Sequence, residues 1–96
     1  MQTFIEESKT LFTFTDEMSE KSTLTFDKHV ADSLHTIVGD VHTWIQQQYD
    51  GIIAGDKRYV KYINAVVLNN GELTRLAIGN IIRLVASMLI VENVDF

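Results

Sequence analysis

Ninety-six residues are enough for one small domain, and we expect residues 1–96 to fold as a single unit. The chain is 46% hydrophobic and 22% charged, which is too apolar for a disordered tail. It contains no cysteine, which excludes a disulfide framework and a thiolate nucleophile. The formal net charge of −5 arises in residues 1–50, which hold nine acidic and three basic residues. This acidity argues against nucleic acid as a partner, because phosphates repel it.

The sequence carries no sign of a membrane or export segment. Fully apolar runs reach four residues, as in residues 88–91, whereas a membrane-spanning helix needs about 20. Residues 1–7 lack the basic start and the long apolar stretch of a signal peptide. We therefore expect no membrane partner and a cytoplasmic location.

Residues 3–26 fit two interpretations. Thr3 and Glu6 have the spacing of a capping box, which favours a short helix within residues 3–12. Residues 10–15 and 22–26 instead alternate polar and apolar side chains, a pattern typical of strands, and the polar residues between them suit a hairpin turn. We expect a short N-terminal helix followed by an extended or hairpin-like stretch.

The clearest helical pattern covers residues 27–50. Apolar side chains recur there at spacings of four and three, which predicts one continuous stripe: Val30, Leu34, Ile37, Val41 and Trp44. Thr25 or Asp27 is suited to cap the start of this helix, Gly39 falls on its polar side, and Gly51 is a plausible stop.

Two further helices are expected over residues 56–68 and 72–91. The β-branched and aromatic content of the first keeps a strand as an alternative. Asn70 is well placed to cap the second. The polar residues of this last helix form one narrow stripe, and the rest of its circumference is apolar, which indicates burial on most sides; the stripe comprises Arg75, Gly79, Arg83 and Ser87. The predicted fold class is mainly α, a small three- to four-helix domain with a short N-terminal β-hairpin or extended segment.

No group of residues points to catalysis, a cofactor or a metal. In one continuous helix His35 and His42 would lie about 10 Å apart, too far to share one ion. Asp32 and His35 supply two ligands, which do not make a site. Asp32, Ser33 and His35 are too close along one helix to converge as a hydrolytic triad. We therefore predict that the protein is not an enzyme.

The apolar excess of residues 72–91 predicts self-association. A chain of this length has few elements with which to surround a helix on several sides, and a closed symmetric dimer is the commonest outcome. We expect the interface to include Trp44 and, from the last helix, Ile78, Ile82, Val85 and Leu89.

The leading functional hypothesis is a non-catalytic protein-interaction module that acts as a homo-oligomer. By analogy it is a small inhibitor of a host complex, of the kind that viruses or mobile elements encode. In this hypothesis Asp16, Glu17 and Glu20 bind a basic surface on an unidentified protein.

Two alternatives stay open. One is a binder of a small anionic ligand such as a nucleotide, with Lys57, Arg58, Lys61 and Arg75 supplying charge and Tyr59 and Tyr62 supplying stacking. The other is a structural subunit of a larger assembly, which would show the same apolar excess.

Overall fold

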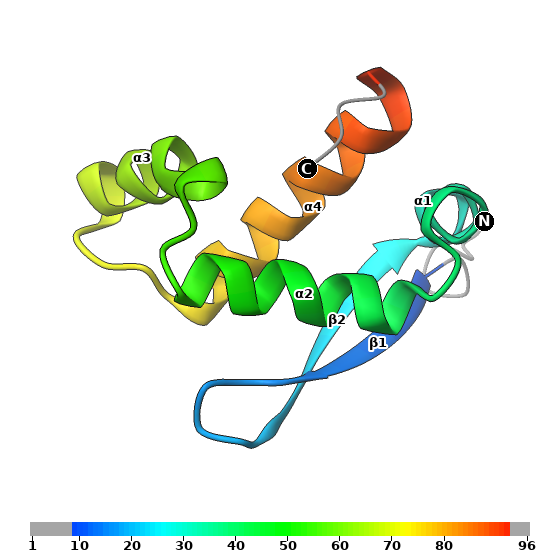
Figure 1. The fold of residues 1–96 in the computed structure, drawn as a ribbon, viewed down its shortest axis with the longest axis horizontal. Coiled ribbons are helices and arrows are strands. Elements are labelled where there is room, and N and C mark those ends of the chain that lie inside the picture. The colour runs from blue at the N-terminus through cyan, green and yellow to red at the C-terminus, as the bar shows by residue number, and fades with distance from the viewer. Residues whose placement is uncertain (1–8, 93–96) are drawn as a thin grey trace, which may run out of the picture.

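A computed structural model describes residues 9–92 of the chain. An antiparallel hairpin comes first, and four α-helices follow within these residues (Figure 1). The elements are β1 (Lys9–Thr15), β2 (Lys21–Asp27), α1 (Lys28–Val38), α2 (Val41–Ile53), the short 3₁₀ helix η2 (Lys57–Tyr59), α3 (Val60–Asn70) and α4 (Arg75–Glu92). The mainly helical fold with an N-terminal hairpin is therefore confirmed.

The alternation of threonines with apolar residues produces the hairpin. Its register pairs Phe12 with Leu24 and Thr13 with Thr23. Because successive side chains point to opposite faces, one face is buried and the other carries Leu11 and most of the threonines; the buried apolar side chains are Phe12, Phe14, Leu24 and Phe26. The expected short N-terminal helix is wrong for residues 9–12, which lie in β1, and its earlier part lies outside the described residues.

The predicted single helix over residues 27–50 is wrong, because it is interrupted after Val38. Gly39 adopts φ +80°, which ends α1. The Asp40 side chain then accepts hydrogen bonds from the Thr43 N–H at 3.1 Å and the Thr43 hydroxyl at 2.8 Å, and so caps α2. Gly39 lies at the junction of two helices rather than on the polar side of one.

Gly51 does not end a helix, since α2 continues to Ile53. A Cβ atom at position 51 would lie 2.9 Å from Cε2 of Tyr59. The glycine therefore admits the Tyr59 ring against α2, where the Tyr59 hydroxyl donates a hydrogen bond to Gln48. This buried tyrosine anchors η2, so the segment predicted as a helix over residues 56–68 begins as a 3₁₀ turn and continues as α3.

The last helix begins three residues later than predicted. Asn70 is the final residue of α3, and Gly71 at φ +85° closes that helix in the left-handed conformation. Thr74 occupies the capping position of α4, because its hydroxyl accepts a hydrogen bond from the Ala77 N–H at 3.1 Å. The expectation that Asn70 caps this helix is wrong.

The core forms where α4 packs against α1 and α2, and the buried face of the hairpin adds its phenylalanines. Figure 1 shows α4 crossing α2, with α1 and α3 on opposite sides. The buried aliphatic and aromatic side chains at the centre include Leu34, Ile45, Tyr49, Ile52, Ile78, Ile82 and Val85. By contrast, α3 has no buried residue and contacts mainly η2 and α4. Among residues 9–92, no helix has both the length and the apolar character needed to cross a membrane.

Gly39→Ala should lower the free energy of unfolding by about 1–3 kcal/mol, because a side chain at φ +80° is strained. Chemical denaturation followed by circular dichroism measures the change. Gln47→Ala, at an exposed position within α2, is the control and should shift stability by less than about 0.5 kcal/mol. Equal stability of Gly39→Ala and the wild type would contradict the assigned helix break.

Candidate protein-interaction surface

Three of the four residues predicted as the polar stripe of α4 face the hairpin, and the fourth, the exposed Ser87, borders a hollow that Arg83 and Thr25 also line. The Arg75 guanidinium donates a hydrogen bond to the Ser22 hydroxyl at 2.8 Å, and Arg83 Nε donates to the Thr25 carbonyl at 3.0 Å. A Cβ atom at Gly79 would lie 3.1 Å from Cδ1 of Leu24, so the helix approaches β2 closely between the two arginines. We call these three residues, Arg75, Gly79 and Arg83, the polar seam.

Asp16 is the acidic partner of the polar seam. Its carboxylate lies 2.8 Å from Arg75, and its side chain is fully inaccessible to solvent. It also accepts hydrogen bonds from the N–H groups of Met18 and Glu20, at 2.8 and 2.9 Å. The Glu20 N–H lowers the pKa of Asp16 most, with further lowering by Met18 and Arg75, while burial acts in the opposite direction. Asp16 therefore holds the turn together and does not lie on an acidic binding surface as predicted.

The other two predicted acidic residues have different surroundings. Glu17 accepts a hydrogen bond from the Tyr49 hydroxyl, which lowers the pKa of Glu17. The pKa of Tyr49 is raised, first by burial and then by this same carboxylate. The Glu20 side chain is exposed. The structure thus brings the three acids into one turn, in which Asp16 is buried while Glu17 and Glu20 are exposed.

The residues proposed for an anionic ligand do not converge. Tyr59 is fully buried, and Arg58 lies 3.2 Å from Asp56. Tyr62 lines a hollow between α3 and α4, whereas Arg75 lines a separate hollow beside β2. Lys57 and Lys61 are exposed, and the Lys61 ammonium sits 5.2 Å from the Tyr62 ring.

The histidine argument also changes, because it assumed one continuous helix. His35 lies on α1 and His42 on α2, and both line one hollow with Asp32 and Asp40. Across residues 9–92, no group of three or more His, Cys, Asp or Glu residues is arranged to hold a metal ion.

The predicted oligomer interface lies largely inside the chain. Four of its five residues are buried in the core, namely Trp44, Ile78, Ile82 and Val85, and Leu89 is half-buried against it. Trp44, Ile78, Ile82 and Val85 are therefore not exposed for contact with a second copy in this fold, whereas Leu89 keeps part of its surface exposed. Other apolar side chains of α4 are exposed on the surface.

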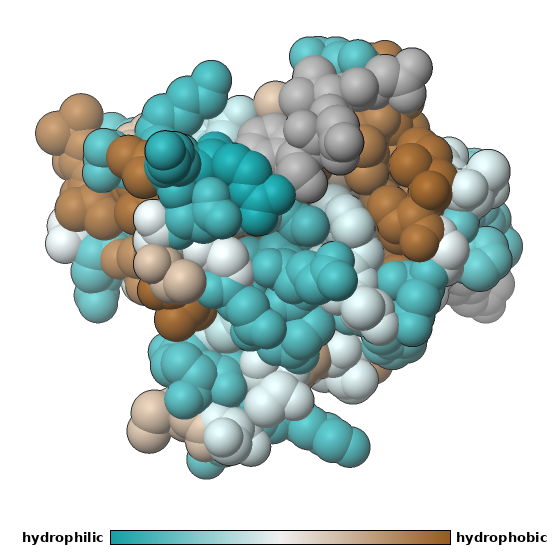
Figure 2. All heavy atoms as spheres, in the orientation of Figure 1, coloured by the Kyte–Doolittle hydropathy of each residue, from teal (hydrophilic) through white to brown (hydrophobic). Residues whose placement is uncertain are grey.

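A different apolar face of α4 is exposed. Leu76 is 73% exposed, Leu84 45% and Val91 79%, and the exposed Asn80 and Ser87 lie between them. At 100° per residue these five side chains fall on one side of the helix. We call this set, Leu76, Asn80, Leu84, Ser87 and Val91, the outer stripe. Figure 2 shows hydrophobic surface over the C-terminal half of α4 and over α3.

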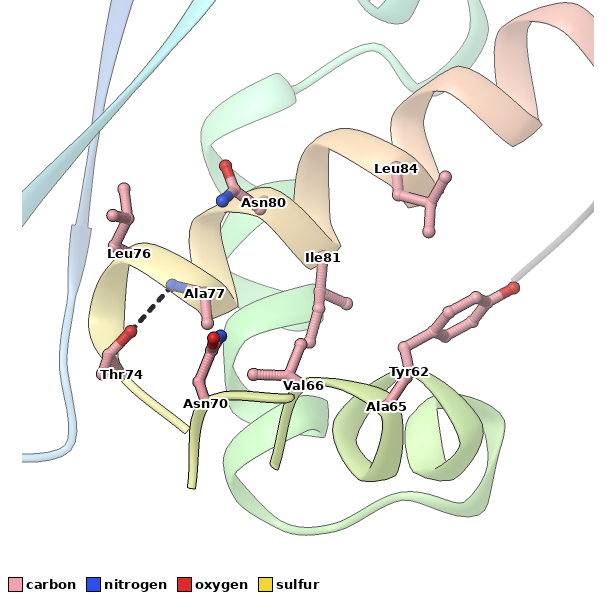
Figure 3. Close-up of a pocket in the computed structure, with 10 residues that line it drawn as sticks. All are labelled: Tyr62, Ala65, Val66, Asn70, Thr74, Leu76, Ala77, Asn80, Ile81 and Leu84. Carbon is pink, nitrogen blue, oxygen red and sulfur yellow. Dashed lines mark hydrogen bonds between the residues drawn. The ribbon is translucent and has the colours of Figure 1, made fainter. Parts of the chain in front are cut away.

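A groove of about 300 Å³ borders the outer stripe on the side of α3. Figure 3 shows Val66 and Ile81 facing each other across it, with Tyr62 and Leu84 at one end. Asn70 and Thr74 lie at the other end, where α3 connects to α4. Leu68 is 86% exposed and follows Ala65, a lining residue, by three positions on α3, so it extends the apolar surface beside the groove.

Sequence reasoning missed the outer stripe because it placed the interface of residues 72–91 on Ile78, Ile82, Val85 and Leu89 and gave no role to Leu76, Leu84 and Val91. The signal was present in the spacing of four, four, three and four from Leu76 to Val91, which is the spacing of a helix-packing seam. Comparisons of this chain with protein-family models, with curated proteins and with solved structures found no match.

Asp16→Asn should reduce the loss of stability in acid. The pKa of Asp16 in the folded chain lies below its ordinary value of 3.8, so its carboxylate stabilises the fold above that pH, and this contribution is lost as the pH falls below it. Urea midpoints at pH 7 and pH 3 measure the effect. The variant should be less stable than the wild type at pH 7. Its urea midpoint should fall less between pH 7 and pH 3 than that of the wild type.

Glu20→Gln is the matched control, because it removes an exposed carboxylate from the same turn. Its urea midpoint should fall between pH 7 and pH 3 by as much as that of the wild type. A full wild-type drop in Asp16→Asn would show that the buried carboxylate does not contribute to acid stability.

Proposed function

We propose that this chain is a non-catalytic protein-interaction module that acts as a homo-oligomer through the outer stripe of α4 and the adjoining groove. The observation that carries the proposal is the exposure of Leu76, Leu84 and Val91 on one face of an 18-residue helix. The opposite faces of the same helix are packed against the chain's own core and hairpin. Large exposed apolar side chains gathered on one helix face, beside an apolar groove, are typical of interaction sites.

The energetics favour covering this surface. Full burial of one leucine or valine side chain is worth about 1.5–3 kcal/mol, so the three exposed side chains of the outer stripe represent several kcal/mol. A specific interface needs at least about 1,000 Å² of buried surface. The groove and the flanking Leu68 widen the apolar area beyond one helix face, which favours a partner that contacts both α3 and α4.

The surroundings of the titratable groups support a non-catalytic function. The carboxylates with lowered pKa values are Asp16, Glu17, Asp27, Asp40 and Asp56. Each is held in a turn, a cap, an ion pair or a hydrogen bond to a core tyrosine. These groups stabilise local structure and do not converge around one cavity. Inhibition of a host complex, and binding of a basic partner by the acidic turn through the exposed Glu17 and Glu20, stay predictions.

The double variant Leu76→Asp with Leu84→Asp should abolish self-association, because it places two charges in a surface that must be desolvated. Light scattering at micromolar concentration should give a wild-type mass above that of one chain, and the mass of one chain for the variant. Leu11→Asp is the matched control, since Leu11 is 59% exposed on the outer face of the hairpin, and it should associate like the wild type. A wild-type monomer over a broad concentration range, or an oligomeric double variant, would overturn the proposal.

A further inference from the structure

We infer that the partner of the outer stripe is a second copy of this chain, packed with its α4 antiparallel to the first across a two-fold axis close to Leu84. This inference rests on the proposed function and specifies its geometry. An isologous contact needs a surface that complements itself when turned by 180°. The outer stripe has that property.

The order of side chains in the stripe reads almost the same in both directions. From Leu76 to Val91 it runs apolar, polar, apolar, polar, apolar. An antiparallel partner therefore places Val91 against Leu76 and brings the two copies of Leu84 together at the centre. The same register places the Asn80 amide opposite the Ser87 hydroxyl, and these two groups can hydrogen-bond. No large apolar side chain of the stripe faces a polar one.

The two flanks of the stripe decide between antiparallel and parallel packing. One flank is the apolar groove, lined by Ala77 and Ile81 with Tyr62 and Val66 of α3. The other flank is the polar seam, where Arg75 and Arg83 meet the hairpin. A two-fold axis perpendicular to α4 gives antiparallel packing. It places the groove of one copy beside the groove of the other, and the polar seam of one copy beside the polar seam of the other. A two-fold axis parallel to α4 would set each apolar groove against the partner's arginines.

The charges of the seam and the exposed apolar side chains beside the groove agree with the antiparallel arrangement. On the seam side, the carboxylate of Asp16 pairs with Arg75, and Asp27 lines the same hollow as Arg83, which limits repulsion between two seams. On the groove side, Leu68 of each copy adds exposed apolar surface beside the joined grooves. Antiparallel helices also align their dipoles favourably. Four helices, two copies of α3 and two of α4, would then share one apolar layer.

Cross-linking of single-cysteine variants tests this register, and the absence of native cysteine makes the experiment unambiguous. Asn80→Cys and Ser87→Cys are prepared separately, one with a size tag, then mixed and treated with a short thiol cross-linker. Antiparallel packing places position 80 opposite position 87 of the second copy and separates like positions by about 10 Å along the helix. The mixed product should therefore exceed both homodimeric products several-fold. Gln47→Cys, exposed on α2, replaces either variant as the control and should give no product above background.

The outcomes separate this inference from the proposed function. Light scattering on each variant reports whether the chains still associate. Associated chains that form mainly 80–80 and 87–87 products would overturn the antiparallel register and leave the proposed function standing. Monomers at every concentration would overturn both.

A distance measurement between spin labels tests the same register without a cysteine at position 80 or 87. Spin labels on Glu92→Cys, at the exposed end of α4, should lie about 25 Å apart along the helix axis in the antiparallel dimer. In a parallel dimer they would be separated by about one helix spacing, roughly 10 Å. The short distance would overturn the inference.

Discussion

The ion pair between the buried Asp16 carboxylate and the half-exposed Arg75 links the hairpin turn to the start of α4. Asp16 lies directly after β1, and Arg75 is the first residue of α4, so one contact joins the two ends of the described fold. The carboxylate organises the turn through the N–H groups of Met18 and Glu20 while it pairs with the arginine. Because a helix has a fixed angle between residues, this contact also fixes the rotation of α4. With the polar seam turned toward β2, the outer stripe is left largely exposed, although Leu76 also borders the hollow beside β2.

The helices also satisfy the free edges of the hairpin. The Gln46 amide accepts a hydrogen bond from the Thr15 N–H at 2.7 Å and donates one to the Thr15 carbonyl at 2.9 Å, as a neighbouring strand would. Arg83 Nε donates a hydrogen bond to the Thr25 carbonyl on the other edge of the hairpin. A two-stranded hairpin is marginally stable by itself, and free edges invite pairing with other chains. These contacts occupy hairpin edges that could otherwise pair with another strand, which is consistent with the proposal that association uses α4.

The local pattern of the sequence predicted the elements better than their junctions. Alternation of threonine with apolar residues was sufficient for the hairpin, since that pattern acts between neighbours. The break at Gly39 was hidden because α1 and α2 keep the same three-and-four spacing of apolar residues across it. Gly51 lies inside α2 because the Tyr59 ring packs on it. That packing depends on a residue eight positions later and on a chain reversal which no local pattern reveals.

The interaction surface was harder to predict, because burial depends on contacts between distant residues. Asp16 resembles its neighbours Glu17 and Glu20 in sequence, yet it is buried because Arg75 reaches it from 59 positions away. Within α4, Ile78 and Leu76 are equally apolar, and only the rotation of the helix separates core from surface. The sequence therefore indicated the apolar excess of this helix, but not which of its apolar side chains are buried in the core and which are exposed.

Methyl NMR with a soluble paramagnetic agent tests the central claim, the rotation of α4, most directly. At a dilution where the chain is monomeric, the agent should broaden the methyl signals of Leu76, Leu84 and Val91 and spare those of Ile78, Ile82 and Val85. At higher concentration the first group should become protected and the second should stay unchanged. Protection of the first group at every dilution, or broadening of the second, would contradict the account.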